Sequence, residues 1–126
     1  MSARADALQR IDAALAELAA VQASLAAARR EEGVAIDRTD LARRFQSIAH
    51  ASTGHHRLVF VHELAALAGK VAPAGECEVV QQAADVLSLL LRDLGHQLLG
   101  CRGAEVTPAA TALRERLEHE LLTPHR

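Results

Sequence analysis

The sequence contains almost no aromatic side chains. Phe45 and Phe60 are its two phenylalanines, and it has no tyrosine or tryptophan. The chain therefore lacks the aromatic platforms on which proteins stack the bases of single-stranded nucleic acids. Prolines and glycines are scarce as well, at three and seven among 126 residues. With so few helix breakers among many alanines and leucines, the composition predicts long helices around an aliphatic core.

Charge of one sign and long apolar runs are also missing. The formal net charge is −2 and no block of like charges occurs, which argues against a nucleic-acid partner. No apolar run reaches the roughly 20 residues of a membrane span. Arg4, Asp6, Arg10 and Asp12 interrupt the first stretch, so we expect no signal peptide. These absences predict a soluble, cytoplasmic protein without a membrane partner.

The cysteines and the common nucleophile motifs give little evidence of a function. Cys77 and Cys101 flank one predicted helix, which would hold them about 36 Å apart, too far for a disulfide. A reduced environment is the simpler interpretation. Neither cysteine lies in a Cys-His pattern, and the sequence has no Gly-x-Ser-x-Gly and no glycine-rich phosphate loop. We therefore expect no catalytic triad and no nucleotide site.

Apolar residues recur at helical spacing along the whole chain, which predicts one all-α domain over residues 1–126. The expected fold is a five-helix up-and-down bundle, with a four-helix core and an additional helix. The predicted helices run from about Ala3 to Glu32, from a cap at Asp37 or Thr39 to between Gly54 and Leu58, from Val59 to Lys70, from Glu76 to Leu99, and onward from a cap at Thr107.

The first predicted helix has a heptad seam with one polar position. The seam consists of Leu8, Ile11, Leu15, Leu18, Gln22 and Leu25. Two interpretations stay open. The helix can pack within its own bundle, or the seam can form a coiled-coil contact in a homodimer.

The second predicted helix carries a histidine on its outer face. At about 100° per residue, its apolar stripe is formed by residues within about 40° of Leu41. These are Leu41, Phe45, Ile48 and Ser52. His50 points about 180° away from Leu41, toward solvent. The residues expected around it are Arg43, Gln46, Ser47, Gly54 and Arg57. An imidazole displayed in this way is accessible to another protein.

Metal ligation is the first chemistry to consider, because four histidines fall within thirteen residues. These are His50, His55, His56 and His62. Helical metal sites pair their ligands at i, i+3 or i+4, as in Glu-x-x-His, and that motif does not occur. We predict no bound metal and no cofactor, with a metal-binding bundle as the least favoured alternative. We expect His55 and His56 to be partly buried near the end of the helix.

An exposed, neutral imidazole can also act as a nucleophile toward a phosphoryl donor. Arg43, Arg44 and Arg57 make the second helix locally basic. Arginines near such an imidazole would stabilise the negative charge of a phosphoryl group. The simpler interpretation is that they form a solvated helix face.

The stretch around His50 resembles the motif of histidine phosphotransfer (HPt) domains. That motif reads His-x-Leu-Lys-Gly, often after an alanine, with leucines fourteen and seventeen residues beyond the histidine. The matching residues are Ala49, His50, Gly54, Leu64 and Leu67, within a resemblance that covers about Leu41 to Val71. Ser52 and Thr53 stand where the motif has leucine and lysine, and Phe60 stands at the usual second glycine.

The resemblance implies a bacterial phosphorelay intermediate in a two-component signalling pathway. His50 would be the phospho-acceptor, and Gly54 would give the partner clearance. Arg43, Gln46, Ser47, Thr53 and Arg57 would line the docking face. The implied partner is a response-regulator receiver domain or a histidine kinase. Two alternatives stay open: a degenerate HPt domain that docks a receiver without phosphotransfer, and a helical adaptor unrelated to phosphate.

Overall fold

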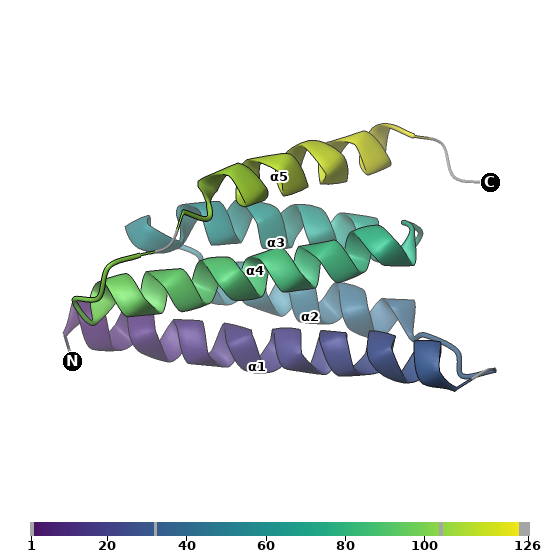
Figure 1. The fold of residues 1–126 in the computed structure, drawn as a ribbon, viewed down its shortest axis with the longest axis horizontal. Coiled ribbons are helices and arrows are strands. Elements are labelled where there is room, and N and C mark those ends of the chain that lie inside the picture. The colour runs from purple at the N-terminus through teal and green to yellow at the C-terminus, as the bar shows by residue number, and fades with distance from the viewer. Residues whose placement is uncertain (1, 32, 104, 124–126) are drawn as a thin grey trace.

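The structure, a computed structural model, describes residues 2–31, 33–103 and 105–123, and these contain helices but no strands. The helices are α1 (Ala3–Arg30), α2 (Arg38–Ala51), α3 (Val59–Val71), α4 (Cys77–Leu98) and α5 (Thr107–Leu122), with a short 3-10 turn, η1 (His56–Leu58), before α3. Figure 1 shows them running up and down alongside one another. The predicted five-helix up-and-down bundle is confirmed.

Helices α1 to α4 form a closed ring in which each packs against the next, and α4 returns to pack against α1. Helix α5 lies outside this ring, against α3 and α4 (Figure 1). The start of α1 and the ends of α2 and α4 lie at the same end of the bundle. That end carries His50.

The core is aliphatic, as the composition predicts. Its largest fully buried side chain is Phe45 on α2, which packs among leucines, isoleucines and valines from the neighbouring helices. Ala110, Leu113 and Leu117 of α5 belong to the same cluster. Burial of a leucine or phenylalanine side chain contributes about 1.5–3 kcal/mol, so this shared core is what holds α5 to the ring.

Helix α1 buries a face rotated slightly from the predicted seam. Ile11, Leu18 and Leu25 are buried as expected. A second row of buried residues on α1 consists of smaller side chains, Ala7, Ala14 and Val21. The predicted seam residues Leu8, Leu15 and Gln22 are half-buried at its edge. The rotation arises because α1 packs against two helices, α2 and α4, and not against a single partner.

Helix α1 is also long and apolar enough, by length and composition, to cross a membrane, the one such helix in the part of the chain that the structure describes. Core helices of soluble proteins meet the same criteria. Its alanines account for this hydropathy without any long run of larger apolar residues.

Two predicted boundaries are wrong. Helix α5 begins at Thr107, which is therefore not its cap; the capping position is Val106, and no side chain caps the helix there. Helix α2 ends at Ala51, before the predicted range of Gly54 to Leu58. The end predicted for the first helix, Glu32, lies outside the described residues, and α1 ends at Arg30.

Candidate functional site

His50 lies on the outside of α2, one residue before the helix ends. The opposite face of the helix is buried, with Leu41, Phe45 and Ile48 each at most 1% exposed. Ser52 follows at 3% exposure. This distribution confirms the predicted stripe. The His50 imidazole forms no hydrogen bond or ion pair with the described residues, so both of its ring nitrogens are open to solvent or to a partner.

The helix end that carries His50 is held from both sides by long-range hydrogen bonds. Arg10 of α1 donates from Nη1 to the carbonyl oxygen of Ala51 at 2.6 Å. His62 of α3 places Nδ1 2.7 Å from the carbonyl oxygen of Ala49. Because a carbonyl oxygen only accepts hydrogen bonds, His62 Nδ1 must carry the proton that forms this one. The backbone under His50 is therefore fixed by both neighbouring helices.

Helix α2 stops where two hydroxyl side chains compete for its last carbonyls. Ser52 Oγ donates to the carbonyl oxygen of Ile48 at 2.8 Å, and Thr53 Oγ1 donates to that of Ala49 at 3.0 Å. Gly54 then adopts φ +78°, with open space where a Cβ would lie. Such local hydroxyl bonds and a left-handed residue are typical of a helix end.

The early end of α2 corrects the expected position of Gly54. It lies in the turn after α2, and not one turn further along the same exposed helix face. The positive φ alone accounts for glycine at this position. Leu64, one of the leucines of the HPt resemblance, is fully buried in α3, and Leu67 is half-buried against the core.

The three docking residues predicted on the helix itself are all exposed, on the side of α2 that His50 shares. Arg43 forms an ion pair with Asp40, one turn before it. Gln46 packs its Cγ close to Gly69 of α3, 3.2 Å from the position of a Cβ there. Ser47 lies at the rim of a small hollow of about 190 Å³ between α1 and α2.

The two remaining predicted docking residues lie beyond the end of α2. Thr53 turns its hydroxyl back onto the end of α2, where it also lies 3.4 Å from His62 Nδ1. Arg57 lies in η1 and lines a separate pocket together with Arg4.

The nearby cations are largely compensated within α2. Asp40 pairs with Arg44 at 3.0 Å as well as with Arg43, and Arg44 also reaches Glu17 of α1 at 3.2 Å. The hydrogen bond from Arg44 holds the pKa of the Asp40 carboxyl below its ordinary value. The same bond raises the pKa of Arg44. Neither arginine is a free cation poised at His50.

His55 and His56 lie beyond the end of α2, before and at the start of η1. The rings of His55 and His56 stack on each other, with centroids 5.2 Å apart. His55 is half-buried, whereas His56 is exposed, so the expectation of partial burial is met by His55 alone. Within residues 2–31, 33–103 and 105–123, no group of three or more histidine, cysteine or carboxylate side chains could hold a metal ion.

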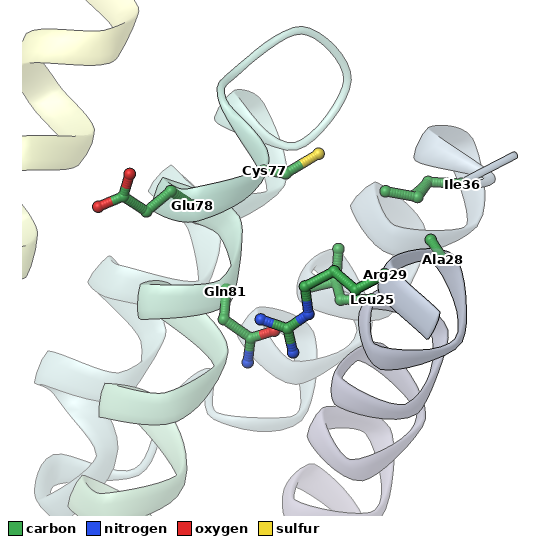
Figure 2. A pocket seen from close by; sticks show the side chains of 7 residues that line it. All are labelled: Leu25, Ala28, Arg29, Ile36, Cys77, Glu78 and Gln81. Carbon is green, nitrogen blue, oxygen red and sulfur yellow. The ribbon is translucent and has the colours of Figure 1, made fainter. Parts of the chain in front are cut away.

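A second hollow, of about 320 Å³, lies at the opposite end of the bundle, between the end of α1 and the start of α4. Figure 2 shows its wall, formed by Leu25, Ala28, Arg29, Ile36, Cys77, Glu78 and Gln81. Cys77 and Cys101 are both free and exposed. Arg38 donates from Nη2 to Cys77 Sγ at 3.1 Å, a contact that sequence patterns do not indicate.

What the sequence missed at His50 is the anchoring of the helix end. Arg10 lies 41 residues from Ala51, and His62 lies 13 residues from Ala49. No local pattern predicts such pairs, because they depend on how the helices pack.

Comparison of the chain with known protein families, with curated proteins and with solved structures finds no match.

Proposed function

We propose that the protein is a phosphorelay intermediate whose His50 accepts a phosphoryl group from a receiver-domain aspartate and passes it on. The observation that carries this proposal is an exposed imidazole that has no hydrogen-bond or ion-pair partner among the described residues, on a helix end fixed by Arg10 and His62. A fixed backbone restricts where the ring can lie, and positioning of the reacting groups is a large part of catalysis in phosphoryl transfer.

The reaction requires few groups of the protein other than the His50 imidazole. An unprotonated nitrogen of His50 forms a bond to phosphorus while the bond from phosphorus to the donor aspartate oxygen breaks. The aspartate leaves as a carboxylate. Transfer onward reverses these steps with a second aspartate. The resemblance of residues 49–54 to the HPt motif, together with the helical bundle, supports this class of reaction.

The charge around His50 favours a partner that brings its own cations. Asp40 and Glu17 compensate Arg43 and Arg44, and Thr53 stands where the HPt motif has lysine. The same observation is the basis of a second candidate function. In it, the exposed face of α2 docks a receiver domain without exchanging phosphate.

Labelling with phosphorylated receiver domains tests the proposal. Receivers charged with acetyl phosphate are incubated with the wild-type protein, and acid-labile phosphohistidine is mapped by mass spectrometry at alkaline pH. We expect label at His50 and none in His50→Gln. His119→Gln is the matched control, because it removes an exposed histidine of α5 and should be labelled like the wild type.

Two results would contradict the phosphotransfer proposal. One is the absence of label with a broad panel of receivers, and the other is equal labelling of His50→Gln. If a receiver binds the wild type without labelling it, and Gln46→Ala or Ser47→Asp weakens that binding, the docking function replaces phosphotransfer.

A further inference from the structure

A pocket of about 320 Å³ opens where the start of α1, the turn η1 and the end of α4 meet. Four of its lining residues can carry charge, and all four are basic: Arg4, His55, His56 and Arg57. Ala3, Gln97 and Leu98 complete the wall. No carboxylate lies among these residues, although the chain as a whole carries 16 aspartates and glutamates against 14 lysines and arginines.

The carboxylates on the adjoining turns are already engaged. Asp6, one turn into α1, pairs with Arg10 at 2.8 Å. Asp93, one turn before Gln97 on α4, accepts a hydrogen bond from Gln97 Nε2 at 2.6 Å. Neither arginine of the pocket forms an ion pair with a described residue. Two arginines without such an ion pair on the wall of one hollow attract an anion.

The stacked histidines add hydrogen-bond donors to the same wall. The backbone N–H of Arg57 donates to His55 Nδ1 at 3.3 Å, so this nitrogen carries no proton and the ring is protonated at Nε2. The His56 ring lies nearly parallel to it, at an interplanar angle of 10°.

We propose that this pocket binds a phosphate group, either free or as a small monoester. Guanidinium groups match the oxygen atoms of phosphate in pairs, and the imidazole N–H groups supply further donors. Leu98 and Ala3 give one wall an apolar character that suits the organic part of an ester. The volume lies at the lower end of the range of small-molecule sites, about 300–1,000 Å³.

The site does not depend on phosphotransfer at His50. Its residues come from α1, from α4, and from η1 with His55 directly before it, whereas His50 belongs to α2. The two proposals can therefore fail independently. His50→Gln should bind phosphate like the wild type, even if it cannot be labelled.

Titration followed by NMR tests the pocket directly. Inorganic phosphate and glycerol 3-phosphate are added at constant ionic strength to ¹⁵N-labelled protein, and backbone and histidine resonances are recorded. We expect saturable shifts at Ala3, Arg4 and His55 to Arg57. Arg57→Gln should weaken binding about tenfold, as expected for the loss of one charge-assisted contact. Tighter binding of the ester identifies an organic phosphate as the ligand, and equal binding identifies the phosphate group alone.

Arg92→Gln is the matched control, since it removes one exposed positive charge of α4 outside the pocket. Circular dichroism verifies that each variant is folded, and Arg4→Gln provides a second pocket variant if Arg57→Gln is not. Absence of saturation with both anions would overturn the proposal. So would an equal loss of affinity in Arg92→Gln and the pocket variants.

Discussion

Gly54 has two possible reasons to be glycine, and they act on different properties of the protein. Its φ of +78° is a conformation that side chains with a Cβ disfavour, whereas the space around it is open. Stability should therefore depend on the backbone conformation and not on steric clash. Docking of a partner, in contrast, would depend on the size of the side chain at this position.

Substitutions at Gly54 separate these two effects. Gly54→Ala should lower the free energy of unfolding by about 1 kcal/mol, measured by urea denaturation, because alanine resists the left-handed conformation. Gly54→Asn should cost less, since asparagine tolerates that conformation better. Equal stability of the alanine variant and the wild type would show that the turn does not require positive φ.

The same pair of variants bears on the function of His50. If Gly54 gives clearance to a receiver, Gly54→Asn should reduce phosphoryl labelling of His50 although the fold is nearly unaffected. If Gly54→Asn is labelled at the wild-type rate, the positive φ of the backbone is the only reason for glycine at this position.

At the scale of the element, α2 is stabilised at its start by acidic groups. Asp37 caps the helix and accepts a hydrogen bond from the backbone N–H of Asp40 at 3.0 Å. Asp40 binds the guanidinium groups of Arg43 and Arg44. Both carboxylates lie near the positive end of the helix dipole. This end of the helix should therefore weaken in acid.

The lowered pKa of Asp40 sets the direction of that effect. The hydrogen bond from Arg44 favours the ionised carboxyl in the folded state, so its contribution is present above the unfolded pKa, near 4. It is lost as the pH falls through the lower, folded-state pKa. We expect the urea midpoint of the wild type to fall between about pH 5 and pH 3, and that of Asp40→Asn to fall less.

Asp12→Asn provides the comparison for this series. Asp12 is exposed on α1 and forms no ion pair with the described residues. This variant should keep the pH dependence of the wild type. If Asp40→Asn keeps it as well, the ion pairs of Asp40 do not stabilise the fold in solution.

The helices were predictable to different degrees, for physical reasons. The start of α2 carries a capping side chain, Asp37, and the inward face of α2 follows from apolar spacing alone. The end of α2 depends on Ser52 and Thr53 bonding back to carbonyls, and these residues are also tolerated inside helices. Threonine before proline suggested a cap at Thr107, but the chain enters α5 one residue earlier without one.

The candidate sites were predictable only where they are local. The exposure of His50 follows from its angle to Leu41 on one helix. The pocket of Arg4 and Arg57 brings together residues about 50 positions apart, which only the packing of α1 against the rest of the bundle decides. For the same reason, the place of Arg57 on the wall of this pocket was not predictable from the sequence.

At the scale of the whole molecule, the seam of α1 bears on oligomeric state. Ile11, Leu18 and Leu25 are at most 3% exposed within the bundle of a single chain. Large exposed apolar side chains are distributed over several elements, from Val34 to Leu122. A coiled-coil dimer through this seam would require α1 to leave its own core.

We therefore expect sedimentation equilibrium to give a single species of about the chain mass, 13.5 kDa, across a wide concentration range. Ala16→Glu, which places a charge on the exposed side of α1, should leave that mass unchanged. A wild-type dimer that Ala16→Glu dissociates would show instead that the outer face of α1 pairs two chains.

The position of His50 at the end of α2 bears on how long a phosphoryl group could stay there. The carbonyl end of a helix carries a partial negative charge, and a phosphate near it is repelled, whereas a helix start would attract it. Arg10 and His62 cover two of the last carbonyls but do not reverse the dipole. Phosphorylated His50 would lie high in free energy and would give up its phosphoryl group readily. Such a residue suits rapid transmission of a signal, and not its storage.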